Sequence, residues 1–185
     1  MSFDELATRL ADSARVAFTQ ARRLHPGESF YCYALYTDAF AAYILPTCAS
    51  EEGLCQIAKR YAEKSGRTVD EHAASLRWGP ADSPYHLLGE EHFAGVLGLL
   101  ESRDLPWQHA DDAVDVEVDG RFDACFRALA ALEQEGFFGH GAERDRVVVN
   151  VLQGDQSDES VLENARRLNP PAAVAQLERD LHVSS

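Results

Sequence analysis

The first apolar pattern along the chain predicts a long amphipathic helix. From Phe3 to Leu24, apolar residues recur in steps of three and four, which places them on one face of a helix. Ser2 and Glu5 precede this pattern with the S-x-x-E spacing of a capping box. Pro26 comes directly after it and cannot continue a helix. The chain is therefore expected to begin with one helix of about six turns.

Three short stretches predict a small β-sheet. Ser29–Thr37 is rich in aromatic residues, and Asp38 and Ala39 form a turn that leads into the return strand Phe40–Leu45. The third strand, Arg146–Leu152, is a β-branched run. All three are apolar on both faces, as strands are when helices cover the sheet on both sides.

Helical patterns fill most of the remaining chain. The helices are expected after the N-cap Ser50, over Glu90–Ser102, from Phe122 to the C-cap Gly136, from about Asp158, and after Asn169 and Pro170 as N-cap and N1. Two segments are ambiguous. Residues 68–75 are compatible with a short helix, and the alternating valines of residues 114–118 fit either an edge strand or the entry of a helix. The fold expected from these elements is α+β, with a small, mainly antiparallel sheet covered by five or six helices. With 185 residues and no linker-like segment, residues 1–185 are expected to form a single domain.

The net charge of the chain indicates which classes of binding partner are favourable. The chain has 31 acidic and 17 basic residues and a net charge of −14. Nucleic acid and anionic membranes are unfavourable partners, because both require clustered Lys and Arg. A protein partner with a basic surface is compatible with this balance.

Cysteine usage and the N-terminus favour a cytoplasmic protein. Cys32, Cys48, Cys55 and Cys125 form no C-x-x-C pair and resemble small buried hydrophobic residues. They are expected to be free thiols, with no zinc bound. The N-terminus resembles no signal peptide, and no apolar run is long enough for a membrane span.

The stretch Leu76–His92 is the segment least like ordinary helix or strand. It brings Arg77, Trp78, Asp82, Tyr85 and His86 around two prolines, and these five are the candidate binding residues. The competing interpretation is a packed structural loop, in which both aromatic side chains are largely buried. In that case Trp78→Ala is expected to be far more destabilising than removal of a surface Arg77 or His86 side chain.

The spacing of the His, Asp, Glu and Ser residues does not match known catalytic or metal-binding motifs. His86 and His92, with Asp82 and the acids that follow, match no standard metal motif. Ser83 lies too close in sequence to His86 for a typical catalytic triad, which is assembled from distant segments. The segment GDQSDES at residues 154–160 has one Gly and no Lys, so it predicts a capped helix start and not a phosphate loop. No cofactor is expected.

Several motifs resemble those of a bacterial family of domains of unknown function of about this length. They are YALYTD, LRWGPADSPYH, GEEHF, EQEGFFG and VNVLQGDQSDES followed by ARRLNPP, and they span residues 29–181. The resemblance implies no activity. By analogy with other small acidic families, the first hypothesis is a non-enzymatic binding protein, of immunity type or an adaptor, acting through an acidic surface. The alternative is an enzyme with a site around Asp82, His86 and His92.

Overall fold

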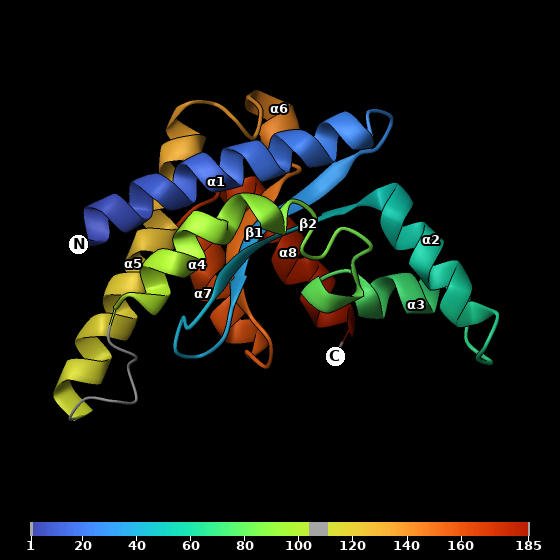
Figure 1. Ribbon diagram of the computed structural model, residues 1–185. Helices are drawn as coiled ribbons and strands as arrows, with labels where there is room; N and C mark the ends of the chain where they lie inside the picture. Colours follow the sequence, from blue (N-terminus) through green and yellow to red (C-terminus); the bar gives the residue numbers. More distant parts are fainter. Residues whose placement is uncertain (1, 104–110, 185) are drawn as a thin grey trace.

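A three-stranded mixed sheet lies at the centre of the protein. The computed structural model describes residues 2–103 and 111–184. Strand β1 (Phe30–Thr37) is central; β2 (Ile44–Ser50) pairs with it antiparallel, and β3 (Val148–Gln153) pairs with it parallel. Figure 1 shows the sheet enclosed by helices. The predicted α+β class is confirmed, and the third strand makes the small sheet mixed.

Helices cover both faces of the sheet. They are α1 (Phe3–Leu24), α2 (Glu51–Ala62), α3 (Val69–Leu76), α4 (Ala94–Glu101), α5 (Asp111–Gln134), α6 (Gly141–Arg144), α7 (Asp158–Arg166) and α8 (Pro171–Ser184). Short 3-10 turns η1 (Pro80–Asp82) and η2 (Glu90–Phe93) follow α3 and precede α4. The described residues thus contain more helical segments than the five or six expected.

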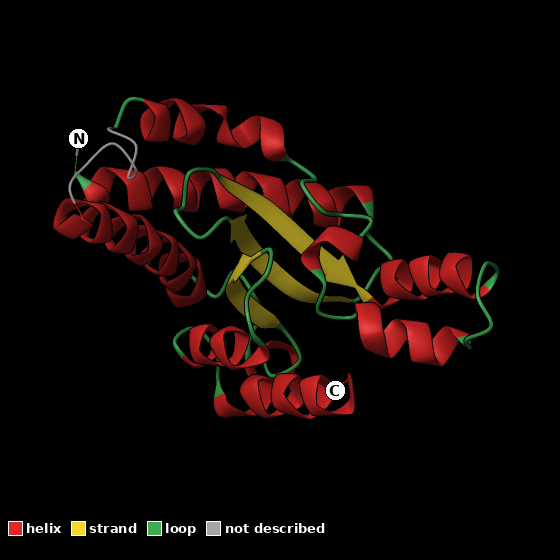
Figure 2. Ribbon diagram, turned by 90° about the horizontal axis from the view of Figure 1, so that it is seen from below, coloured by secondary structure: helices red, strands yellow, loops and turns green. Residues whose placement is uncertain are grey.

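Alternate residues of the strands face two separate cores. Tyr33, Leu35 and Val149 pack with α1 and α5, whereas Ala34 and Val148 pack with α7 and α8. This alternation follows from the two-residue period of a strand. Figure 2 shows the two helical layers on either side of the sheet, with the α2–α3 pair projecting beyond it.

Capping side chains fix most helix starts where the sequence predicts them. Ser2 and Ser50 accept hydrogen bonds from the third residue of α1 and α2, and Thr68 forms a complete capping box with Glu71 at α3. The ambiguous segment 68–75 is therefore helical. The expectation for Asn169 is wrong. Helix α8 begins at Pro171, one residue after the expected Pro170, and the Asn169 amide bonds to β3.

The return strand is displaced from its predicted position. Phe40–Leu45 was expected, but β2 is Ile44–Ser50. The carboxylate of Asp38 accepts hydrogen bonds from the backbone N–H groups of Phe40 and Ala42, so the chain turns for longer before it returns. Pro46 does not end the strand. Its carbonyl accepts a hydrogen bond from Leu87, outside the sheet, so its missing N–H lies on the edge where proline is tolerated.

Side-chain amides saturate the free edge of β3. Both the N–H and the carbonyl of Val149 bond to Asn169, at 2.7 Å each. The Val151 N–H donates to Asn150 Oδ1, and its carbonyl accepts from Asn164. The edge presents no open backbone groups at these residues, which protects it from pairing with another strand.

Helix α5 begins in the segment whose valines alternate. Of the two interpretations of residues 114–118, the helix is correct, since α5 runs without interruption from Asp111. It packs closely on α1 at Gly120, where a Cβ atom would lie only 2.2 Å from the Phe3 ring. Among the described residues, no helix is long and apolar enough to cross a bilayer.

Candidate functional site

The Leu76–His92 stretch wraps around the outer edge of β2. Ser83 Oγ donates a 2.6 Å hydrogen bond to the Cys48 carbonyl, and His86 forms an isolated antiparallel bridge with Thr47. Its aromatic residues reach both faces of the sheet. Tyr85 packs in the core under α1, and Trp78 packs against the core under α8. The five predicted binding residues therefore do not converge on one site.

Arg77 forms a polar network that joins three helices, and Trp78 packs beside it. Arg77 forms two hydrogen bonds with Glu51, at 2.8 and 2.5 Å, and one of 3.1 Å with Asp180. Its guanidinium lies 4.1 Å from the centre of the Tyr31 ring, and Trp78 packs edge-on against the same ring. Trp78 is half-buried and packs against the core under α8. Because its carboxylate partners already compensate the charge, Arg77 is a structural cation.

Tyr85 and Asp82 also have internal partners. The Tyr85 hydroxyl donates to the Glu28 carboxylate at 2.5–2.6 Å, and its ring lies 4.5 Å from that of His25. Tyr85 is buried, as predicted, and burial raises its pKa to about 12. Asp82 accepts a long hydrogen bond of 3.4 Å from Tyr61.

The histidines of this stretch lie against different elements. The His86 ring packs edge-on against Tyr36 of β1, and burial lowers its pKa although Glu90 acts in the opposite direction. His92 Nε2 lies 2.5 Å from the Gln20 amide oxygen on α1. In the described part of the chain, no three His, Cys, Asp or Glu side chains are grouped as metal ligands. The binding role of the five residues stays a prediction.

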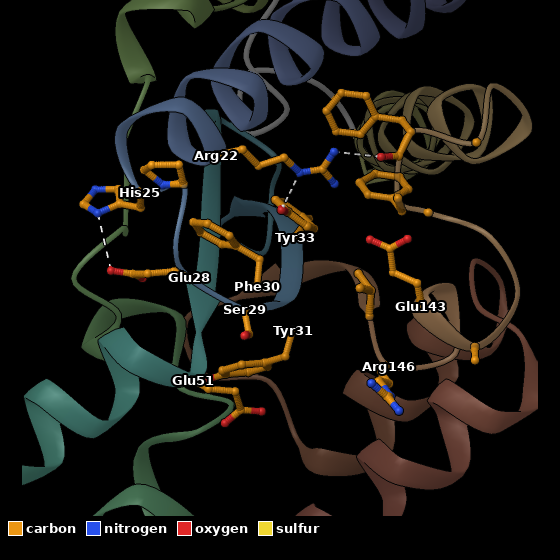
Figure 3. Close-up of a pocket in the computed structure, with 17 residues that line it drawn as sticks. Arg22, His25, Glu28, Ser29, Phe30, Tyr31, Tyr33, Glu51, Glu143 and Arg146 are labelled. Atoms are coloured by element: carbon orange, nitrogen blue, oxygen red, sulfur yellow. Dashed lines mark hydrogen bonds and ion pairs between the residues drawn. The ribbon is translucent and has the colours of Figure 1, made fainter.

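A separate cleft of about 850 Å³ opens at the end of the sheet where β1 and β3 begin. Its walls come from the C-terminal turn of α1, the start of β1, the 136–139 loop and the 142–147 segment (Figure 3). The loop forms because Gly136 and Gly139 have φ values of +72° and +102°, in the region that favours glycine. Phe30 and Phe137 are half-buried at its surface, and Tyr33 is buried behind them.

Arg22 is held in the cleft by two hydrogen bonds. Its Nε donates to the Tyr33 hydroxyl at 2.7 Å and its Nη1 to the Phe137 carbonyl at 2.9 Å. The guanidinium also lies 4.8 and 4.5 Å from the ring centres of these residues. Both hydrogen-bond partners are neutral, so Arg22 is fixed in position while its charge stays uncompensated.

Two further charged side chains line the cleft without a partner. Arg146 and Glu143 are both exposed, and neither forms an ion pair or side-chain hydrogen bond within residues 2–103 and 111–184. In Figure 3 the Glu143 carboxylate points into the cleft. The His25–Glu28 pair, 3.4 Å apart, closes the opposite side. This arrangement can bind a ligand by charge and ring contacts.

Comparison with known proteins identifies a family. The family described as Domain of unknown function (DUF4303) matches residues 10–170. The chain belongs to the DUF4303 family. No curated protein and no solved structure matches it. The resemblance seen in the sequence is thus confirmed, and the family gives the cleft no assigned role.

Sequence reasoning missed the cleft for identifiable reasons. Arg22 lies in an ordinary helical pattern, and Arg146 was assigned to a strand end. The one available signal was EQEGFFG at residues 133–139, where two aromatics stand between glycines. In the DUF4303 domain this motif supplies Phe137, whose carbonyl and ring both hold Arg22.

Proposed function

We propose that this protein is a non-enzymatic cytoplasmic binding protein, of immunity type or an adaptor, that captures a protein partner at the cleft between α1, β1 and residues 136–147. The observation that carries the proposal is the pairing of half-buried aromatic rings with charged side chains that have no partner among the described residues. Such anchors dominate binding energy in protein interfaces.

The acidic exterior supports a basic partner. A net charge of −14 attracts a positively charged protein and speeds their encounter. Toxins that attack nucleic acid need clustered Lys and Arg to contact phosphate, so an acidic inhibitor would complement such an enzyme. The alternative, an enzyme around Asp82, His86 and His92, gains no support, because these three side chains bond to three different elements.

Site-specific photo-crosslinking in the native host tests the proposal. A photoreactive residue at position 146 is expected to trap one partner, and the same residue at Glu163, exposed on α7, serves as the control. The trapped protein should bind the purified chain, and the double variant Glu143→Ala/Arg146→Ala should weaken that binding at least about tenfold. Equal binding by wild type and the double variant, or trapping from position 163 alone, would contradict the proposal.

An immunity role has a more direct test. If the trapped partner is toxic when expressed alone, co-expression of the wild-type chain should restore growth. The double variant should restore it less. Rescue that is equal for both chains would place the inhibitory surface elsewhere.

A further inference from the structure

Arg22 differs from every other sheltered arginine that the structure describes. Six arginines are buried or half-buried. Five of them pair with a carboxylate: Arg15 with Glu135, Arg77 with Glu51, Arg103 and Arg121 with Glu117, and Arg144 with Glu133. Arg22 has only a phenol and a peptide carbonyl as partners. The absence of a carboxylate beside Arg22 is unusual in a chain with an excess of acids, because shielding a cation from water without a counter-charge costs free energy.

The held guanidinium is preorganised to receive an anion. Its Nε–H and one of the two Nη1 N–H groups are occupied, and Nη2 has no partner in the described chain, while the side chain lines the cleft. Two flanking rings fix its plane, so little side-chain entropy is lost on binding. In Figure 3 the guanidinium lies above Tyr33.

We propose that Arg22 is the anchor for a carboxylate of the bound partner, with an apolar or aromatic group beside that carboxylate packing on Phe30 and Phe137. This rests on the proposed function, in which the cleft receives a partner segment. The carboxylate belongs to a chain terminus or to an acidic side chain of that segment. Arg146, on the other side of the cleft, attracts the same negative charge from a more exposed position.

The surroundings favour a single carboxylate over a phosphate group. Glu28, Glu51 and Glu143 also line the cleft, and their charges would repel a dianion more strongly than a monoanion. The wall beside Arg22 is aromatic, which suits an apolar or aromatic group next to a carboxylate. Glu143 points into the same space, so it competes with an incoming anion and sets its affinity.

Titration with a small acid and its neutral isostere tests the assignment. The probes are N-acetyl-phenylalanine and N-acetyl-phenylalanine amide, followed in all variants through the backbone N–H resonances of Phe137 and Gly139, which line the cleft, in nitrogen–proton correlation spectra. The acid is expected to bind about tenfold more tightly than the amide, because a charge-assisted hydrogen bond is lost in the amide. Arg22→Gln should remove that preference and Glu143→Gln should strengthen acid binding several-fold.

Arg23→Gln is the matched control. Arg23 is the next residue of α1, is exposed and lies outside the cleft, so it changes net charge equally without touching the site. Equal binding of acid and amide, equal effects of the two arginine variants, or no saturable shift with the acid would overturn the assignment. Inorganic phosphate binding as tightly as the acid would also overturn it.

The outcomes separate this inference from the proposed function. If the crosslinked partner depends on the cleft but Arg22→Gln binds it normally, only the carboxylate assignment fails. If the acid binds at Arg22 but the partner ignores the cleft, the carboxylate site stands as a small-molecule site and the proposed function fails.

Discussion

Arg77 and Arg22 are similar in chemistry and opposite in role. Both guanidinium groups lie over a tyrosine of β1, at 4.1 Å from the Tyr31 ring and 4.8 Å from the Tyr33 ring. Arg77 is neutralised by Glu51 and Asp180, whereas Arg22 bonds only to neutral acceptors. The comparison shows that an arginine's partners, more than its aromatic neighbours, separate a structural cation from one available to a ligand.

The regions around them differ in the same way. Around Arg77, the polar groups of the loop that follows α3 form hydrogen bonds with β2 and with neighbouring helices. Around Arg22, the cleft leaves Glu143 and Arg146 uncommitted in the described structure. The loop should therefore contribute mainly to stability, and the cleft mainly to binding.

Replacing Arg77 should produce the largest loss of stability. Arg77→Ala would remove the 3.1 Å ion pair with Asp180, whose side chain is 19% exposed, and the bidentate contact with Glu51. The unfolding free energy is expected to fall by about 2–3 kcal/mol, below the range for fully buried pairs because Glu51 is half exposed. Urea unfolding measures this loss.

Arg22→Ala is the partner variant for that measurement. It removes two hydrogen bonds to neutral groups, and it also removes an uncompensated charge, so a loss of about 1 kcal/mol is expected. Equal losses for the two variants would erase the distinction between the two arginines. A larger loss for Arg22 would reverse it.

The fold was largely predictable because its signals are local. The α1 stripe, the Ser50 cap and the β3 run follow from periodicity and capping chemistry in neighbouring residues. The errors arose where distant contacts decide. The Asp38 carboxylate lengthens the turn before β2, and Asn169 turns away from α8 to bond with β3. Neither partner can be inferred from spacing alone.

The candidate site was less predictable for the same reason. The stretch Leu76–His92 was singled out because its composition is unusual. In the structure its residues bond to the outer edge of β2. Arg22 and Arg146 are 124 positions apart in the sequence. They line the same cleft because β1 and β3 pair in parallel. Their lack of carboxylate partners is a property of the folded chain, so no motif could reveal it.

Trp78 should have the second-largest effect on stability. The sequence-based expectation ranked Trp78→Ala well above Arg77→Ala. From the structure, the stability losses expected for the two variants are similar, because Trp78 is half-buried and Arg77 is not a surface residue. A loss of about 2 kcal/mol is expected, below the range for full core truncation. Trp78→Phe is the control, since it keeps the contact with Tyr31 and deletes the buried indole N–H that has no partner in the described structure.

The same pair of variants also tests the recognition hypothesis for the loop. With the crosslinked partner in hand, Trp78→Phe should bind it as wild type does. If Trp78→Ala instead leaves the thermal midpoint unchanged and abolishes partner binding, the loop is the recognition surface. The contrast with the cleft would then be lost.

His86 should give the smallest effect, visible only as a dependence on pH. Burial lowers its pKa in the folded protein below the ordinary value of about 6.5. Between these two values the unfolded chain binds more protons than the folded one, so stability decreases as the pH falls below about 6.5. His86→Asn should flatten this slope between roughly pH 7.5 and the lowered pKa. Urea midpoints of the wild type and of His86→Asn across this range measure the effect. An unchanged slope in His86→Asn would show that the ring is not constrained between Tyr36 and Thr47, and the loop would then be looser than a purely structural element requires.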